Sequence, residues 1–416
     1  MRKHSVIIDI DKCVGCTTCN KACPNESIRV RNRKARILDQ RCIDCGVCIS
    51  KCPHGAISSI HNNLDVIKKY KYTVALPDQA LFGQFTKVRD PNVVLTALLM
   101  LGFDDICEPA ASAELIAQFA IEDMKNGSAP QGPTISSCCP TILRLIRMRF
   151  PDLIPNVVNT MIPMEHAAII AREKAVQYTG YAPEDIGVIA IVPCPSQITE
   201  SKHPETLLEP VIDECIPIVD IYATLESAIK KVDEPLDLCR TGRRGLTHGY
   251  SGGESAARKA YNFIAVDEIQ NCIKMLEEIE NGNIPDVDYI ELNACTCGCV
   301  GGSLCVGNPF NAKLRIKKML GVLPEYYCAY ELSEENKKHI YASRKLEYLP
   351  AFLLDEDMSM AFEKMNRIQE IRKKLPGIDC GGCGAPSCNA FAEDIVMINA
   401  EYSRCVFRRG QTLDSK

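Results

Sequence analysis

The sequence predicts an α/β protein whose central part has mainly parallel sheets and whose two ends are small cysteine-rich domains. In residues 73–345, short β-rich runs alternate with helical stretches, and this alternation is typical of folds with parallel strands. Residues 1–60 are dense in cysteine, glycine and proline and contain only short apolar runs, so we expect a domain that folds around metal. A second cysteine-bearing segment, residues 376–416, follows a predicted helix.

The composition excludes two classes of partner and favours metal binding. The chain has 416 residues, 46% of them hydrophobic, which is enough for several domains with buried cores. A net charge of −5 provides no basic surface for nucleic acid, and the lack of any run of about 18 apolar residues predicts no membrane span. The N-terminus lacks the apolar stretch of a secretory signal. In such a chain, 24 cysteines indicate metal ligation in a reducing compartment, so we expect a cytoplasmic protein rather than a disulfide scaffold.

The elements of the central part follow from its apolar runs. Four runs predict buried strands, at residues 72–76, 187–194, 217–223 and 288–295. Four longer stretches predict helices, at residues 91–103, 111–127, 163–180 and 265–282. Ligands bind at the carboxyl ends of parallel strands. Cys194 and Cys295 follow two of the predicted strands, so we expect both at such a site.

Residues 1–60 contain the same cysteine spacing twice. The pattern C-x2-C-x2-C-x3-C-P begins at Cys13 and again at Cys42. This is the bacterial ferredoxin pattern, in which the fourth cysteine of each run ligates the other cluster. We therefore expect a small α+β ferredoxin-like domain with two 4Fe–4S clusters, the first held by Cys13, Cys16, Cys19 and Cys52 and the second by Cys42, Cys45, Cys48 and Cys23. Zinc sites or disulfides are the alternative for these cysteines.

A third cysteine motif lies in the C-terminal part. Residues 346–375 are expected to form a linker that ends in one helix, residues 357–375, with an apolar stripe at Phe362, Met365, Ile368 and Ile371. The stripe predicts packing on the central domain, with partner binding as the alternative. The following motif resembles the small 4Fe–4S domain found at the ends of several redox and corrinoid proteins. We expect a small helical domain over residues 376–416, with a cluster, or alternatively a zinc ion, held by Cys380, Cys383, Cys388 and Cys405.

Three motifs in the central part carry a resemblance to a known family. They are TISSCCPT (134–141), IVPCPSQITE (191–200) and ELNACTCGCVGGS (291–303). In order and spacing they resemble the three signature motifs of the iron–iron (FeFe) hydrogenases, and the stretches 101–109 and 250–260 match as well. With the flanking modules, the resemblance covers nearly the whole chain. It points to divergent, sensory members that carry an N-terminal two-cluster domain and a C-terminal 4Fe–4S domain.

The resemblance implies a two-lobed hydrogenase domain over residues 73–345 with an H-cluster between the lobes. Cys139, Cys194 and Cys295 would ligate a 4Fe–4S cubane. Cys299 would bridge this cubane to a diiron subsite that carries CO, cyanide and a dithiolate. Soft thiolate ligands suit iron. The implied cofactors are therefore three accessory 4Fe–4S clusters and one H-cluster.

Proton transfer is the second property that the resemblance implies. In the family, the cysteine before the first cubane ligand passes protons to the bridging dithiolate, and here that residue is Cys138. A thiol suits this task because it is small and its pKa lies near the working range, although a buried inert thiol is the alternative. Glu122 is the expected acid nearer to Cys138, with a solvated surface charge as the alternative. Phe119 takes the place of the outer acid, and Ile162 takes that of a serine.

The residues expected around the diiron subsite are Pro77, Pro193, Ser196, Gln197 and Asn293. Pro77 is kept from the family pattern, but several positions around it depart from that pattern. Gln197 replaces a lysine that donates to cyanide, and such a charge-assisted bond is about twice as strong as a neutral one. Val192 and Asn293 replace two methionines, and Asp78 replaces a serine. The changes predict a retuned site rather than one optimised for turnover.

The sequence leaves three functions open. The favoured one is a hydrogenase-type protein that interconverts H2 with two protons and two electrons at low turnover, with a sensory or regulatory bias. An ordinary ferredoxin-linked catalytic hydrogenase and a non-catalytic hydrogenase-like Fe–S assembly protein are the alternatives. The implied partners are H2 and protons, a ferredoxin or similar electron carrier, the hydrogenase maturases and a regulatory partner protein.

Overall fold

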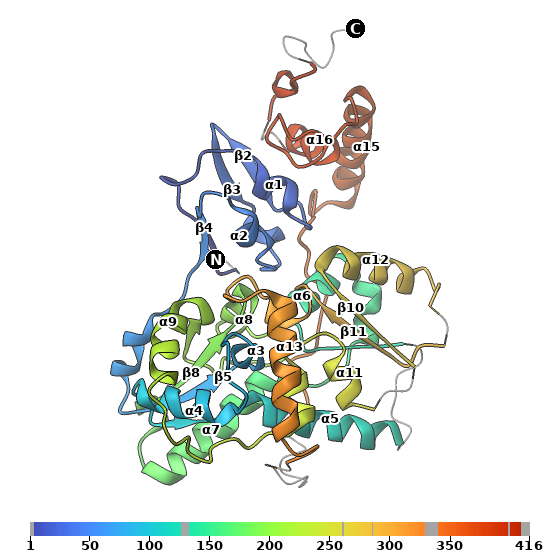
Figure 1. The fold of residues 1–416 in the computed structure, drawn as a ribbon. Helices are drawn as coiled ribbons and strands as arrows, with labels where there is room; N and C mark the ends of the chain where they lie inside the picture. The colour runs from blue at the N-terminus through green and yellow to red at the C-terminus, as the bar shows by residue number, and fades with distance from the viewer. Residues whose placement is uncertain are drawn as a thin grey trace. The chain divides into compact units, whose positions relative to one another are not determined.

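The computed structural model describes residues 4–125, 133–259, 262–284, 286–327, 329, 340–397 and 400–408, without the side chains of residues 122–125. Residue contacts divide the chain into two compact units (Figure 1). Unit 1 joins the two ends of the chain, Met1–Ser59 and Leu349–Lys416, and unit 2 is Ile60–Tyr348. The α/β fold class expected from the sequence is confirmed, because both sheets of unit 2 are parallel.

The larger sheet of unit 2 has four parallel strands in the order β6-β5-β8-β9. Their bounds are Tyr72–Pro77 (β5), Asp105–Ile106 (β6), Ile186–Val192 (β8) and Glu214–Pro217 (β9). The central pair runs in register from Tyr72 opposite Ile186 to Pro77 opposite Ile191. All residues of β8 are buried, as a continuous apolar run in a parallel sheet requires. The carboxyl ends of β5 and β8 therefore lie side by side.

The smaller sheet of unit 2 has three parallel strands in the order β10-β11-β7. Their bounds are Thr134–Ile135 (β7), Phe263–Asp267 (β10) and Tyr289–Asn293 (β11). The central strand pairs Tyr289 with both Thr134 and Phe263. This sheet brings the first and third hydrogenase-like motifs, which are far apart in sequence, onto neighbouring strands.

Helices complete unit 2 (Figure 1). Their bounds are Gln79–Phe82 (α3), Pro91–Met100 (α4), Pro109–Lys125 (α5), Pro140–Arg149 (α6), Pro163–Thr179 (α7), Pro195–Glu200 (α8), Ile218–Ile229 (α9), Arg243–Thr247 (α10), Gly253–Ala257 (α11), Ile269–Glu280 (α12) and Pro309–Met319 (α13). A short 3-10 turn, η5, spans Cys299–Gly301. Proline occupies the first turn of many of these helices, where its missing N–H costs nothing.

Two predicted elements of unit 2 were wrong in type. The run 217–223, expected as a strand, is the start of α9, because its apolar residues Ile218 and Ile221 continue at helical spacing to Leu225. The stretch 265–282, expected as one helix, begins as β10 and becomes helical only from Ile269. In both places, strand and helix follow each other within a single apolar run.

The N-terminal part of unit 1 is a small α+β fold built from two antiparallel strand pairs. It contains β1 (Val6–Ile8) paired with β4 (Ile57–Ser59), β2 (Ile28–Arg31) paired with β3 (Lys34–Ile37), and the short helices α1 (Thr18–Ala22) and α2 (Val47–Lys51). Its core is small and mixes apolar residues with cysteines, among them Val6, Ile28, Cys19 and Cys48. Such a core supports the expectation that the domain needs metal to be stable.

The C-terminal part of unit 1 consists mainly of α15 (Met358–Lys374) and α16 (Cys388–Val396). Ile368 and Ile371 of α15 are buried in a core that contains Phe391 of α16. The expectation that the apolar stripe of this helix packs on the central domain was therefore wrong for these two residues, which stabilise the C-terminal module itself. Phe362 and Met365 of the same stripe are 59% and 38% exposed.

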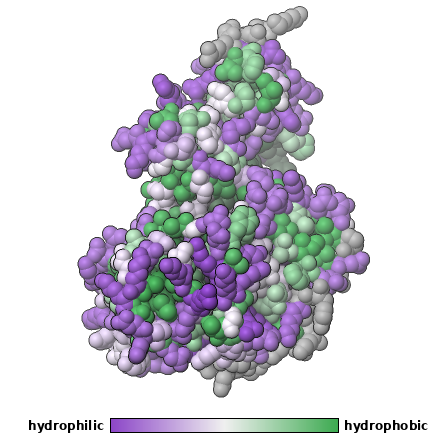
Figure 2. All heavy atoms as spheres, viewed as in Figure 1, coloured by the Kyte–Doolittle hydropathy of each residue, from purple (hydrophilic) through white to green (hydrophobic). Residues whose placement is uncertain are grey.

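None of the helices within the described residues combines the length and the apolar character needed to cross a membrane. Hydrophilic residues cover most of the face shown in Figure 2, and apolar residues form smaller patches between them.

Candidate metal centres and proton site

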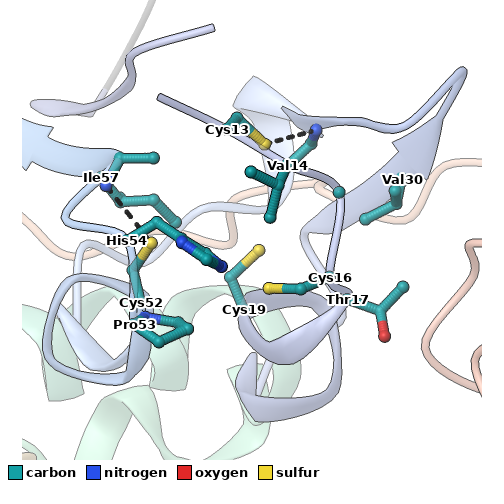
Figure 3. Close-up of a pocket in the computed structure, with 13 residues that line it drawn as sticks. Cys13, Val14, Cys16, Thr17, Cys19, Val30, Cys52, Pro53, His54 and Ile57 are labelled. Atoms are coloured by element: carbon teal, nitrogen blue, oxygen red, sulfur yellow. Dashed lines mark hydrogen bonds between the residues drawn. The ribbon is translucent and has the colours of Figure 1, made fainter. Parts of the chain in front are cut away.

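The first ferredoxin-like pocket gathers the four cysteines that the sequence assigns to one cluster. Cys13, Cys16, Cys19 and Cys52 all line it, and Figure 3 shows their side chains around one common space. Two backbone amides donate to sulfur, from Ala35 to Cys13 Sγ and from Ala56 to Cys52 Sγ, both at 3.3 Å. Such donors stabilise thiolates that ligate iron. The pocket therefore has the donor set that a 4Fe–4S cluster requires.

The second pocket gathers the other four cysteines of the N-terminal domain. They are Cys23, Cys42, Cys45 and Cys48. The amide of Ser27 donates to Cys23 Sγ at 3.2 Å. Burial raises the pKa of the Cys45 thiol to about 12, so without metal this thiol stays protonated. A bound cation reverses that preference because a coordinating thiol loses its proton.

The third pocket lies in the C-terminal part of unit 1. It is lined by Cys380, Cys383, Cys388 and Cys405. The motif's Cys388 begins α16, and Asp379 Oδ1 accepts from the Cys388 amide at 2.6 Å. The four thiols that the sequence assigns to one C-terminal cluster are thus together in space.

The four central cysteines stand where strands end in unit 2. Cys139 precedes α6 after β7, Cys194 precedes α8 after β8, and Cys295 follows β11. Cys299 opens η5. Burial raises the pKa of Cys299 well above its usual range, and the nearby Cys194, Cys139 and Cys295 raise it further. The four half-buried thiols therefore form one group drawn from both sheets, which suits a cluster with soft sulfur ligands.

The loop after β11 approaches its neighbours too closely for side chains. A Cβ on Gly302 would lie 2.3 Å from the carbonyl oxygen of Pro193, which in turn accepts from the Leu304 amide at 2.9 Å. Gly298 has a φ of +84° and would meet the backbone of Tyr250 and Ser251. Glycine is required at both positions. Pro193, an expected cofactor contact, thus also anchors the loop that carries Cys299.

Cys138 has a carboxylate partner that the sequence did not predict. Its Sγ donates to Oε1 of Glu254 at 3.2 Å. Ser136 Oγ donates to Oε2 of Glu254 at 2.6 Å, and the Tyr289 hydroxyl donates to Oε1 at 2.5 Å. Arg258 contacts the same carboxylate at 3.1 Å. The signal was present in the stretch 250–260, where Glu254 and Arg258 are spaced for an ion pair on one helical turn.

This network fixes the charge of its members. Burial alone would raise the pKa of Glu254, but the Arg258 guanidinium outweighs it and holds that pKa below its usual range. Burial and the Glu254 carboxylate together raise the pKa of Cys138 well above that of a free thiol. Burial lowers the pKa of the neighbouring His248 to about 4. At neutral pH the group therefore contains a protonated thiol, an ionised carboxylate and a neutral imidazole.

The other residues expected on the proton route, Glu122, Phe119 and Ile162, are not shown to contact Cys138. Glu122 lies in α5, but its side chain is outside the described residues. Phe119 is buried and meets the ring of Tyr341 edge-on, with 5.1 Å between ring centroids. Ile162 is buried at the start of α7. The described acid beside Cys138 is therefore Glu254, from the first turn of α11.

Gln197 and Asp78 form a pair beside the central cysteines. Gln197 Nε2 donates to Asp78 Oδ2 at 2.8 Å, and the Ala80 amide donates to Asp78 Oδ1 at 2.8 Å. Burial raises the pKa of Asp78, and its charge raises that of Cys299. Oε1 of Gln197 is buried and has no hydrogen-bond partner among the described residues. One polar atom of this amide is thus free for a further ligand.

The remaining expected contacts serve the surrounding framework. Asn293 ends β11 and donates from Nδ2 to Oε1 of Glu291 at 2.9 Å. Glu291 also accepts from the amides of Gly252 and Ser255, so Asn293 helps to hold the start of α11, which bears Glu254. Ser196 Oγ accepts from the buried Arg144 at 3.3 Å, and Pro77 ends β5 directly before Asp78.

Comparison with known families now identifies the central part. Residues 71–257 and 241–303 match the family described as iron only hydrogenase large subunit, C-terminal domain. Residues 5–53 match the 4Fe-4S dicluster domain, and residues 375–407 match the FeS family. The hydrogenase match therefore covers most of unit 2, and the two iron–sulfur matches cover both parts of unit 1.

The individual proteins that match this chain have low sequence identity to it. Iron hydrogenase 1 of Clostridium pasteurianum is 24% identical over 267 residues, 53% of this chain and 46% of that protein. The cytosolic Fe-S cluster assembly factor NAR1 of Neosartorya fischeri is 26% identical over 121 residues, 29% of this chain and 18% of that protein. The chain thus spans about half the length of the hydrogenase and less of the assembly factor.

A solved structure shares the fold. An apo variant of the FeFe-hydrogenase HydA1 from Chlamydomonas reinhardtii superposes with a TM-score of 0.51 and 14% identity, covering 67% of this chain and 95% of that one. At this identity the likeness concerns the fold alone. The family match, by contrast, covers more than half of the chain and includes all three central cysteine motifs. The chain therefore belongs to the iron only hydrogenase family, as a member with the large subunit's C-terminal domain.

Proposed function

We propose that this protein interconverts H2 with two protons and two electrons at an H-cluster, with low turnover and a sensory role. Cys139, Cys194 and Cys295 would hold a 4Fe–4S cubane, and Cys299 would bridge it to a diiron subsite with CO, cyanide and a dithiolate. When bound, this group supplies the iron at which H2 reacts. The described thiols fit it, because four half-buried cysteines from three loops are close enough to influence one another electrostatically.

The hydrogen bond from Cys138 to Glu254 is the observation that carries the proposal. The thiol adjoins the cubane ligand Cys139, it is protonated, and its partner is an ionised carboxylate. A protonated thiol with a carboxylate behind it is suited to give a proton and to be reprotonated. A protein that only stored or assembled clusters would have no need of such a pair.

The surroundings of the pair favour slow turnover. Glu254, Arg258 and Tyr289 are all buried, and Arg258 stabilises the ionised form of Glu254. A proton that reaches Glu254 must therefore displace a favourable ion pair in a region with little water. Phe119, where the family has an outer acid, is packed among apolar residues. Proton delivery through these described residues is expected to be slow.

The residues expected around the diiron subsite also favour slow turnover. The family lysine is replaced by Gln197, which already donates to Asp78. A neutral amide gives a weaker bond to cyanide than a lysine ammonium does. Val192 and Asn293 replace two thioethers, and Asn293 is engaged with Glu291. We infer that the site binds and reacts with H2 in a sensory role and turns it over slowly.

The accessory clusters would connect the site to partners. Electrons would pass between an external ferredoxin-like carrier and three 4Fe–4S clusters in unit 1, and a regulatory protein would read the redox state. The maturases that build the diiron subsite would be required as well. None of the described cysteines is in a disulfide, which fits a reducing compartment, and we propose the cytoplasm.

A second candidate function has its own support. The likeness to the assembly factor NAR1 favours a cluster-assembly protein without a diiron subsite. The two candidates differ in what binds to Cys299. H2 evolution by the matured protein, driven by a strong reductant, distinguishes them: the proposal predicts slow but measurable evolution. Evolution as fast as in an ordinary hydrogenase would contradict the sensory role, and none at all would favour the assembly role.

A further inference from the structure

Unit 1 brings two of the expected cluster pockets into contact, and this inference rests on the proposed clusters of that unit. We propose that the cluster held by Cys380, Cys383, Cys388 and Cys405 exchanges electrons directly with the cluster held by Cys13, Cys16, Cys19 and Cys52. The peptide of Gly384 and the amide of Val30 would connect them. The C-terminal module would then be one end of an electron chain rather than a separate appendage.

The connection is a short hydrogen-bonded path. Val30 lines the first pocket, and its amide donates to the carbonyl oxygen of Gly384 at 2.8 Å. Gly384 directly follows the expected ligand Cys383. Asn20, which follows the expected ligand Cys19, donates from Nδ2 to the same carbonyl at 2.9 Å. One carbonyl group thus bonds to residues next to both pockets.

The contact depends on glycine at position 384. Its φ is +83°, and a Cβ there would lie 1.8 Å from the carbonyl oxygen of Val30. No other residue allows the ligand loop to approach β2 so closely. Lys21 adds to the contact from α1, because its Nζ donates to the carbonyl oxygens of Pro386, at 3.1 Å, and of Asp379.

Ion pairs hold the two modules in this arrangement. Asp394 of α16 accepts from Arg29 at 2.8 Å and also pairs with Arg31, and Glu393 pairs with Arg41. Arg31 also donates to the carbonyl oxygen of Cys383 at 3.0 Å. All of these side chains are largely buried. Buried ion pairs of good geometry define one arrangement, since separating them leaves unpaired charge.

The path continues toward the second pocket of the N-terminal domain. Cys19, which lines the first pocket, and Cys48, which lines the second, belong to the same buried core of the N-terminal domain. The three pockets therefore follow one another through Cys383, Cys19 and Cys48. In each step one electron leaves a reduced cluster and enters an oxidised neighbour, and no bond forms or breaks. Electron tunnelling falls steeply with distance, so neighbouring pockets are the ones that exchange electrons.

Electron paramagnetic resonance of the full-length, dithionite-reduced protein tests the inference. Neighbouring reduced clusters broaden each other's signals and speed each other's relaxation. We compare the wild type with the double variant Cys380→Ala/Cys383→Ala, which should lose one cluster's worth of iron. The inference predicts that the signals remaining in the variant are narrower and saturate at lower microwave power than in the wild type.

A charge swap tests the docking contact itself. Arg41→Glu alone should narrow the signals of the N-terminal clusters as the double cysteine variant does. Arg41→Glu with Glu393→Arg should restore the wild-type line width. Lys364→Glu is the matched control, because it breaks the Lys364–Asp355 pair away from the contact and should leave the broadening unchanged. Rescue by the double swap would exclude a general loss of folding as the cause.

The outcomes separate the two proposals. If the wild type binds the iron of all accessory clusters but its signals are no broader than those that remain in the double cysteine variant, the direct exchange is overturned while the proposed function stands. If the iron of the C-terminal pocket is missing altogether, or zinc replaces it, the clusters assumed for the proposed function are wrong, and so is this inference.

Discussion

The thiol of Cys138 donates to Oε1 of Glu254 at 3.2 Å, across 116 positions of sequence. The contact joins the first hydrogenase-like motif to the first turn of α11. It gives the thiol next to Cys139, the proposed cubane ligand, an acidic partner that differs from the one expected on α5.

Replacing Cys138 by alanine is expected to reduce H2 turnover by about 100-fold or more, as loss of a general acid does. The cubane should still assemble, because Cys139 and the other three ligands remain. The measurement is H2 evolution per assembled cluster. Cys215→Ala is the control, since Cys215 is a buried thiol of β9 outside the site and its loss should not change turnover. Equal turnover in both variants would refute the role of Cys138.

Replacing Glu254 by glutamine should destabilise unit 2, because it leaves the Arg258 charge buried without its anion. Breaking a buried ion pair in this way costs about 3–5 kcal/mol. The free energy of unfolding in urea measures the loss, and the double variant Glu254→Gln/Arg258→Gln should recover part of it. Lys230→Gln removes an exposed pair with Glu226 and should cost less than about 1 kcal/mol. A loss for Glu254→Gln no larger than this control would contradict the described network.

Restoring the family lysine at position 197 should not by itself restore fast turnover. In Gln197→Lys, the new ammonium would pair with Asp78, which lies 2.8 Å from the present amide. With Asp78→Ser added, the ammonium becomes available, and we expect turnover to rise by about tenfold, the value of a charge-assisted hydrogen bond over a neutral one. H2 evolution by both variants checks this. A larger gain in the single variant than in the double would show that Asp78 does not hold residue 197.

The buried Glu108 predicts a pH dependence of stability. Burial raises its pKa from 4.5 to about 7, so between these values the folded protein keeps a proton that the unfolded chain has lost. Stability therefore falls as the pH rises from about 4.5 to 7, by up to about 3 kcal/mol from this group. Urea unfolding at pH 5 and pH 8 should show a smaller loss for Glu108→Gln than for the wild type. Identical losses would show that Glu108 does not keep its proton.

The ferredoxin-like cysteine groups were predictable because their ligands follow a known local spacing. The pockets gather the same sets of four that the ferredoxin pattern assigns, including the exchange of Cys23 and Cys52 between runs. Ligation itself stays a prediction. The parallel sheets were predictable from apolar runs, but the run 217–223 was not, since Ile218 and Ile221 suit a strand and a helix equally well until Leu225 is included.

The contacts that decide proton transfer and docking were not predictable in the same way. Glu254 and Cys138 belong to different motifs, and no local pattern says that two such segments meet. Asn293 was expected to face the cofactor, yet its amide donates to Glu291, two residues earlier on the same strand face. Gly384 and Val30 are separated by most of the chain, and only the folded unit 1 makes their hydrogen bond visible.

Infrared spectroscopy of the protein, produced together with the hydrogenase maturases, tests the central claim most directly. CO and cyanide bound to iron absorb where proteins do not, so their bands report the diiron subsite itself. We expect such bands in the wild type, and we expect them to shift when H2 is added and to return when H2 is removed. Absence of the bands in protein whose cubane is fully loaded, or bands that do not respond to H2, would contradict the claim that this chain reacts with H2.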